Sequence, residues 1–169
     1  MTFKRAILAI IILMAAFSRL LPHPPNFTPI MAMGLLGGVY FKNRQFAVIV
    51  PLLAMLISDF VLGFHGTLIW VYSSIVIISL FASMLKPKML HLGAASLASS
   101  MFFFIVTNFG VWMMGAFYPK TIAGLIACYA AGIPFLQNAV VGDLIYVGVL
   151  FGAFELVKRS FPQLSIDAA

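Results

Sequence analysis

Long runs of apolar residues follow one another along nearly the whole chain, and they limit the possible folds more than any other feature. The stretches AILAIIILMAA and LIWVYSSIVIISLFASML contain no charged residue. Hydrophobic residues make up 63% of the 169 residues and charged residues 8%, and the mean hydropathy is +1.12. Soluble globular domains have roughly 25% charged residues. The sequence therefore predicts an integral membrane protein, and its length is that of a single domain.

Six of the apolar runs are candidate membrane spans. A helix needs roughly 20 apolar residues to cross the hydrocarbon core of a bilayer. The second run is shorter and contains Gly34, Gly37 and Gly38, which favours a short or tilted helix buried among the others. We therefore expect an all-α bundle of six transmembrane helices in one domain over residues 1–160, followed by a cytoplasmic tail at 161–169. The expected spans are 5–21, 28–41, 45–63, 67–85, 90–115 and 135–157.

A further apolar stretch lies between the fifth and sixth spans, in YPKTIAGLIACYAAGIP. Its apolar part, from Thr121 to Ala131, is too short to cross a bilayer. Pro119 and Pro134 bracket it, and proline breaks or kinks a helix interior. The sequence predicts a short outer or re-entrant helix here, separate from the sixth span.

The basic residues indicate the orientation of these spans. Cytoplasmic segments of membrane proteins carry an excess of Lys and Arg. With the N-terminus inside, eight of the ten basic residues fall in cytoplasmic segments and two fall outside. We expect both termini in the cytoplasm, and the net charge of +6 does not indicate nucleic-acid binding because the basic residues form no single patch. The inner residues are Lys4, Arg5, Lys42, Arg44, Lys86, Lys88, Lys158 and Arg159, and the outer ones are Arg19 and Lys120.

The start of the chain, MTFKRAILAIIILMAAFSRL, also fits a signal peptide. Lys4 and Arg5 precede an apolar core, and the small residues Ala16 and Ser18 lie near its end. The apolar runs that follow make a retained first span the more economical interpretation.

Polar side chains gather at the outer ends of the predicted spans. Asp143 is the deepest of them, about 12 Å inside its helix at 1.5 Å per residue. A carboxylate at membrane depth is costly unless it is paired or hydrated, so a cavity that opens outward would explain the group. Ion pairs of Asp59 with Arg19 and of Asp143 with Lys120 that lock helices together are the alternative. The candidate substrate-binding residues are Arg19, His23, Asn26, Asp59, His65, Asn108, Trp112, Tyr118, Lys120, Asn138, Asp143 and Tyr146.

Some of the remaining residues have a structural interpretation beside a functional one. His23 and His65 could bind a metal or a ligand, or could be solvated loop residues. Cys128 could be a soft metal ligand, but it fits a small buried hydrophobic residue better. Two motifs of close helix contact, within the chain or with a partner subunit, are Gly34-x-x-x-Gly38 and Gly148-x-x-x-Gly152.

Motifs for catalysis and for ATP hydrolysis are absent from the sequence. It contains no GxxxxGK[ST] phosphate loop and no HExxH or GxSxG motif. Its single cysteine excludes a disulfide within the chain and any CxxC site. We therefore expect neither an enzyme nor a cofactor; a membrane-embedded enzyme with Cys128 or His65 as the reactive group is the alternative.

The order of these features resembles the S-component-like proteins of ECF-type (energy-coupling factor) vitamin transporters. After a first span with a basic tip come the strings RLLPHPPNFTPIMAMGLLGGVYF, SDFVLGFH, TNFGVWMMGAFYPKT, CYAAGIPF and GDLIYVGVLFG. The chain is similar in particular to a group of small bacterial membrane proteins that contain the same PHPPNFTP stretch. The likeness covers nearly the whole chain.

The resemblance implies a substrate-capturing subunit in the bacterial cytoplasmic (inner) membrane. S components bind a vitamin or similar micronutrient from outside and pass it inward with a transmembrane coupling subunit and two ATPases. By resemblance, SRLLPHPPNFTP is the first outer loop and covers the pocket, with Arg19, His23 and Asn26 facing the ligand. The first span has no Ala-x-x-x-Ala face of the kind that typical S components present to the coupling subunit, so a solitary uptake protein is one alternative. A non-transporting scaffold subunit whose outer polar cluster binds a protein is another.

Overall fold

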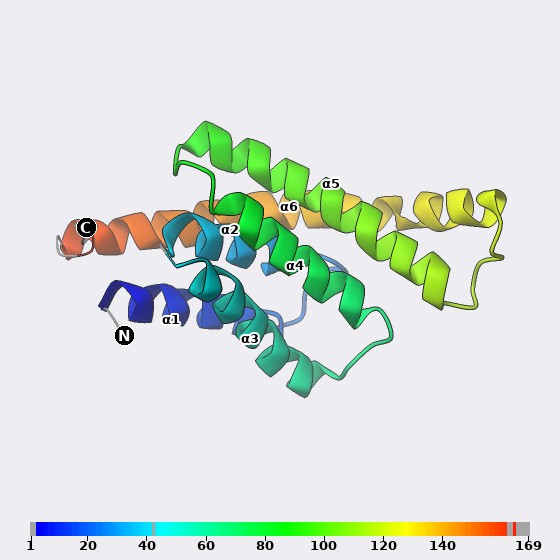
Figure 1. Cartoon of the computed structure of the whole chain (residues 1–169), viewed down its shortest axis with the longest axis horizontal. Coiled ribbons are helices and arrows are strands. Elements are labelled where there is room, and N and C mark those ends of the chain that lie inside the picture. Colours follow the sequence, from blue (N-terminus) through cyan, green and yellow to red (C-terminus); the bar gives the residue numbers. More distant parts are fainter. Residues whose placement is uncertain (1–2, 42, 162–163, 165–169) are drawn as a thin grey trace.

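The computed structural model describes residues 3–41, 43–161 and 164, and it consists of six α-helices (Figure 1). No β-strand occurs in these residues. The all-helical prediction is confirmed. Lys42 and most of the predicted tail lie outside the described residues. The helices are α1 (Phe3–Ser18), α2 (Ile30–Tyr40), α3 (Arg44–Leu62), α4 (Leu68–Ala82), α5 (Met89–Met114) and α6 (Ile122–Ser160).

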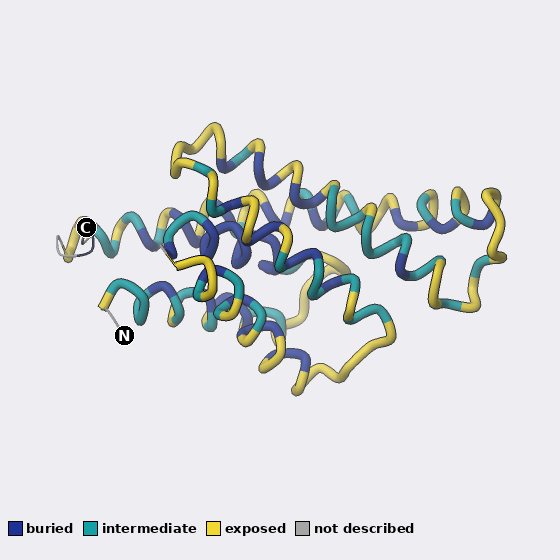
Figure 2. The backbone as a smooth tube through the Cα atoms, in the orientation of Figure 1, coloured by how far each residue is buried: buried dark blue, intermediate teal, exposed yellow. Residues whose placement is uncertain are grey.

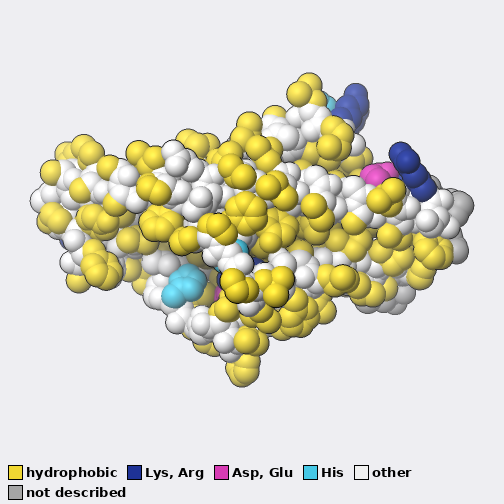
Figure 3. All heavy atoms as spheres, turned by 180° about the vertical axis from the view of Figure 1, so that it is seen from behind, with side chains coloured by type: hydrophobic (Ala, Val, Ile, Leu, Met, Phe, Trp, Pro, Cys, Tyr) yellow, Lys and Arg dark blue, Asp and Glu magenta, His cyan; other side chains and the backbone are white. Residues whose placement is uncertain are grey.

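Successive helices run in opposite directions, so the connections alternate between the two ends of the bundle (Figure 1). One end holds both chain ends together with the α2–α3 and α4–α5 connections. We call it the basic end, because Lys and Arg side chains gather there (Figure 3). The other end, formed by the connections 19–29, 63–67 and 115–121, is called the loop end. The basic end carries Lys4, Arg5, Arg44, Lys86, Lys88, Lys158 and Arg159, and the loop end carries Arg19 and Lys120.

Three helices, α3, α5 and α6, are long and apolar enough to cross a membrane, and α2 and α4 are shorter apolar helices. Hydrophobic side chains are spread over much of the face drawn in Figure 3. Large side chains such as Phe60, Leu90 and Ile122 are each about 80% exposed. Extended apolar surface of this kind is rare on soluble monomers. Helix length and surface together are consistent with a helical membrane protein.

Helix α2 forms the centre of the bundle and contacts all five other helices. Every residue from Ile30 to Gly38 is buried (Figure 2). Its glycines allow the neighbouring helices to approach closely: a Cβ at Gly37 would lie 2.9 Å from the Ala47 carbonyl oxygen of α3, and a Cβ at Gly38 would overlap Ala82 of α4. The predicted short, buried, glycine-rich second helix and its close contact through Gly34 and Gly38 are confirmed.

The second glycine motif behaves differently. A Cβ added at Gly148 or Gly152 would meet no atom within 4 Å. These two glycines of α6 therefore make no close helix contact within the described part of the chain.

The prediction of a separate short helix at 121–131 is wrong. Helix α6 runs without interruption over 39 residues with Pro134 inside it. Contacts with α5 hold its first turns: Tyr129 donates a hydrogen bond to the Ile105 carbonyl at 2.7 Å, and Cys128 donates to the Asn108 carbonyl at 3.4 Å. The proline removes one backbone donor, but packing on both sides of it keeps the helix continuous.

Because of this continuity, α6 is about 58 Å long at 1.5 Å per residue, roughly twice the hydrocarbon thickness. With α5 it forms a hairpin that projects beyond the other helices at the loop end (Figure 1). Near the basic end, the Phe161 ring packs against Phe3, with the ring centroids 5.8 Å apart, and Leu164 is buried. Two residues of the predicted tail are thus in contact with the bundle or buried in it.

Candidate functional site

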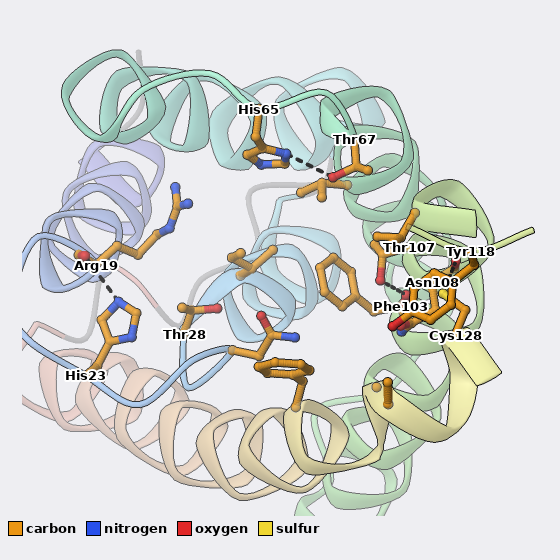
Figure 4. A pocket seen from close by; sticks show the side chains of 17 residues that line it. Arg19, His23, Thr28, His65, Thr67, Phe103, Thr107, Asn108, Tyr118 and Cys128 are labelled. Atoms are coloured by element: carbon orange, nitrogen blue, oxygen red, sulfur yellow. Dashed lines mark hydrogen bonds between the residues drawn. The ribbon is translucent and has the colours of Figure 1, made fainter. Parts of the chain in front are cut away.

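A cavity of about 420 Å³ lies at the loop end (Figure 4). Its walls come from the 19–29 and 63–67 connections, from α4 and α5, and from the first turns of α6. Arg19 and His23 lie on one side, and Asn108, Tyr118 and Cys128 lie on the opposite side (Figure 4). Apolar parts of the wall include Phe103, Val111 and Phe135. The polar residues that line it are Arg19, His23, Asn26, Thr28, His65, Thr67, Thr107, Asn108 and Tyr118.

The 19–29 connection covers one side of the cavity and is fixed to α6. The Asn138 side-chain amide donates to the Pro25 carbonyl at 3.0 Å. Phe27 lies against Gly142, where an added Cβ would be 3.2 Å from the Phe27 Cα, and against the ring of Tyr146. Asn26 has a φ of 62°, a left-handed conformation that asparagine adopts more readily than most residues. Asn138 and Tyr146 therefore support the cover and do not line the cavity.

Arg19 lines the cavity and also forms a buried ion pair. Its Nη1 lies 2.8 Å from Oδ1 of Asp59, and the same nitrogen donates to the Ser58 hydroxyl. The Tyr72 hydroxyl donates to the other Asp59 oxygen at 2.9 Å. The Arg19 side chain is 10% exposed, and its Nε has no hydrogen-bond partner among the described residues. Asp59 does not line the cavity: it forms the predicted alternative, an ion pair that connects α3 to the end of α1.

The cavity wall on α5 consists of residues that share one helical face. Phe103, Thr107 and Val111 follow one another at four-residue intervals, with Asn108 beside them. The Thr107 hydroxyl and the Asn108 amide nitrogen each donate to a backbone carbonyl one turn earlier. Their remaining polar capacity is therefore mainly that of acceptors, on the Thr107 and Asn108 oxygens.

Two predicted residues at the tip of the α5–α6 hairpin have structural contacts instead. The Trp112 indole donates to the Pro119 carbonyl at 3.0 Å. Lys120 Nζ donates to the carbonyls of Trp112 and Gly115. Neither residue lines the cavity, and Lys120 forms no ion pair with Asp143.

Asp143 lies in the interior between α5 and α6. It is 2% exposed and accepts a hydrogen bond from the Ser100 hydroxyl at 2.6 Å. Ser96 and Ser99 of α5 are buried on the same helix. The predicted Asp143–Lys120 pair is therefore wrong, and the carboxylate is accommodated by a serine hydroxyl outside the cavity.

Cys128 lines the cavity but is 2% exposed. In residues 3–41, 43–161 and 164, no group of three or more His, Cys, Asp or Glu side chains could hold a metal ion. His65 is exposed and lies 3.0 Å from the Thr67 hydroxyl, and the His23 ring lies 3.2 Å from the Arg19 carbonyl. The two histidines reach the cavity from different loops.

Residues that the sequence analysis missed include three threonines and two aromatic rings of the cavity. Thr28 and Thr67 lie in the loops, and Thr107 lies on α5. The sequence indicates only the missed residues of α5: Phe103, Thr107 and Val111 are spaced four residues apart beside Asn108, so they share one face of a helix with it. Nothing comparable marks Phe135, because the residues one turn before it, Ala131 and Gly132, have no polar side chain.

A family model described as "Family of unknown function (DUF6580)" matches residues 1–164. The chain belongs to this family. No curated protein and no solved structure matches the chain. The DUF6580 match includes every residue that lines the cavity, so the cavity is formed entirely by the family region.

Proposed function

We propose that this DUF6580 protein is a substrate-binding membrane protein of the S-component type, which captures a vitamin-sized micronutrient for uptake. The main support for this proposal is the cavity at the loop end. Its volume of about 420 Å³ falls in the usual range of small-molecule sites, roughly 300–1,000 Å³. Such sites combine apolar walls with a few convergent polar groups, and this cavity has both.

The proposed topology has six membrane-embedded helices, with both termini on the cytoplasmic side of the bacterial inner membrane. The distribution of basic residues supports it: among the described residues, Arg19 and Lys120 are the only Lys or Arg residues at the loop end. The positive-inside rule then assigns the basic end to the cytoplasm. In this orientation the cavity opens on the outer side, where a substrate would arrive.

The chemistry of the cavity favours a substrate with an anionic or acceptor-rich group and an apolar or aromatic part. No carboxylate is among the described residues that line it. Arg19 brings its guanidinium to the wall, and the ring nitrogens of His23 and His65 add hydrogen-bonding groups. On the other side, Phe103 and Phe135 offer rings for packing. Energy for uptake would come from an ECF coupling subunit with its ATPases, or the protein would act alone.

A scaffold subunit is the second candidate, and one observation favours it. Phe117 and Ile122, at the projecting tip of the α5–α6 hairpin, are 90% and 79% exposed. A protein that docks on this tip would cover them. This candidate predicts a stable protein complex without a bound small molecule.

Native mass spectrometry of the protein, gently extracted from its own host, tests the proposal. We expect a bound small molecule of a few hundred daltons. Ala131→Trp should abolish its retention because Ala131 lines the cavity, whereas Ala130→Trp, at the adjacent exposed position outside the cavity, should not. Retention by both variants would contradict binding in the cavity, and a protein-only complex would favour the scaffold.

A further inference from the structure

A second cavity lies at the opposite end of the molecule, between the end of α4 and the start of α5. Its volume is about 620 Å³. The wall is made mainly of apolar side chains, among them Phe81, Met84 and Ala98. The basic side chains that line it are Lys86, Lys88 and His91.

This cavity continues along the same two helices. A third cavity of about 200 Å³ shares Phe81 and Ala98 with it and extends to Ile78 and Phe102. Along α5, the distance from Lys88 to Phe102 is about 21 Å at 1.5 Å per residue. Half of the hydrocarbon core is about 15 Å thick. The two cavities together form a groove, which we call the α4–α5 groove, long enough to cross one leaflet.

Three features of the groove limit what can occupy it. It is open at the molecular surface, since Met84 is 68% exposed and Phe81 is 45% exposed. No acidic residue lines it in the part of the chain that the structure describes. Neither Lys86 nor Lys88 forms an ion pair there. An occupant that balances these charges and fills the apolar length must combine an anionic head with a hydrocarbon chain.

We propose that the α4–α5 groove binds an anionic phospholipid from the leaflet at the basic end. The headgroup phosphate lies against Lys86, Lys88 and His91, and one acyl chain lies along Phe81 and Ala98. Basic pockets between transmembrane helices at the cytoplasmic face bind anionic lipid headgroups. Helix α5 begins beside the α4–α5 groove, at Met89, without a side-chain cap. The unpaired backbone N–H groups of its first turn therefore add positive potential there. This site requires the membrane orientation proposed above but not the uptake function.

Lipid retention in native mass spectrometry tests the headgroup contacts. The full-length protein in detergent is given equal amounts of phosphatidylglycerol and phosphatidylcholine with identical acyl chains. We expect at least a fivefold preference for phosphatidylglycerol. The double variant Lys86→Gln/Lys88→Gln should lose the preference, whereas Arg44→Gln/Arg159→Gln should keep it, because these two exposed residues lie at the same end but outside the groove. Equal binding of the two lipids, or equal loss in both double variants, would overturn the proposal.

The acyl chain is tested separately. Ala98 is the small exposed residue shared by both cavities, so Ala98→Trp should block the groove and reduce retention of phosphatidylglycerol several-fold. Leu97→Trp, at a neighbouring exposed position outside the groove, is the matched control. Glycerol phosphate at millimolar concentration should not displace the lipid. Displacement by this soluble headgroup, or an unchanged retention in Ala98→Trp, would show an anion site without a lipid groove.

Discussion

Arg19 has two roles that depend on each other, as a cavity-lining residue and as the partner of a buried carboxylate. Its guanidinium is held by Asp59 and Ser58, so its position at the cavity is fixed before any ligand arrives. Removing one member of a buried ion pair is costly because the other charge is left unpaired. The stability of the loop end therefore depends on Asp59 although that residue does not line the cavity.

Asp59→Asn should lower the thermal unfolding midpoint substantially. Losing one partner of a buried pair costs roughly 3–5 kcal/mol, and access of cavity water to Arg19 should keep the loss near the lower end of that range. Glu155→Gln is the matched control: this carboxylate is 45% exposed and pairs with Lys158, so its loss should cost roughly 1 kcal/mol or less. Both values can be measured by thermal unfolding in the same detergent. Equal effects of the two substitutions would contradict the role given to Asp59.

Asp143→Asn should leave ligand affinity within about twofold of the original. The carboxylate is bonded to Ser100 and does not line the cavity, and an asparagine oxygen can accept the same hydrogen bond. A carboxylate within an apolar run indicated a site, but the sequence showed neither where the helix begins nor which side of it Asp143 faces. Helix α6 begins at Ile122, about 32 Å before Asp143 at 1.5 Å per residue, and the side chain is buried. Isothermal titration with the ligand that co-purifies tests this. A loss of tenfold or more would place Asp143 in the binding site.

At the scale of elements, the number and order of the helices were predictable, and their ends were not. Apolar runs and basic turn residues divide the chain at the connections that the structure shows. Pro134 misled the prediction, because a proline in an apolar run is compatible with a break or with a continuous helix. The contacts of Cys128 and Tyr129 with α5 decide between them, and their partners lie 20 and 24 positions away in the sequence.

Gly38→Ala and Gly148→Ala should have opposite effects on stability. An added Cβ at Gly38 overlaps Ala82 and the Ser79 carbonyl of α4, and overpacking of this kind costs roughly 1–3 kcal/mol. At Gly148 a Cβ meets nothing, and alanine favours a helix over glycine by up to roughly 1 kcal/mol. Thermal unfolding of the two variants measures the difference. A similar loss in both would mean that Gly148 faces a close neighbour, such as a second subunit.

Pro134→Ala should raise the unfolding midpoint. The substitution restores a backbone donor to α6, and proline in a helix interior is about 3 kcal/mol less favourable than alanine, so a gain of roughly 1–3 kcal/mol is expected. Pro51→Ala provides the contrast. Pro51 is buried against Gly37, and its loss leaves a gap in the core that offsets the gained hydrogen bond. A lower midpoint for Pro134→Ala would mean that the proline shapes the cavity wall next to Phe135.

At the scale of the whole molecule, the two ends of the bundle differ in both charge and shape. The basic end holds paired Lys and Arg residues and the α4–α5 groove, while the loop end holds the cavity and the projecting hairpin. Charge asymmetry of this kind sets the orientation of a membrane protein during insertion. When every copy of the protein has the same orientation, each end of the bundle faces one aqueous compartment.

Cysteine labelling in intact cells tests that orientation. In a Cys128→Ala background, Gly66→Cys places an exposed thiol at the loop end, and Gln45→Cys places one at the basic end. A membrane-impermeant maleimide should label Gly66→Cys in intact cells and Gln45→Cys only after the membrane is opened, because positive charge retains the basic end in the cytoplasm. The reverse pattern would turn the cavity toward the cytoplasm and contradict capture from outside. Labelling of both positions in intact cells would contradict a bundle whose helices separate two compartments.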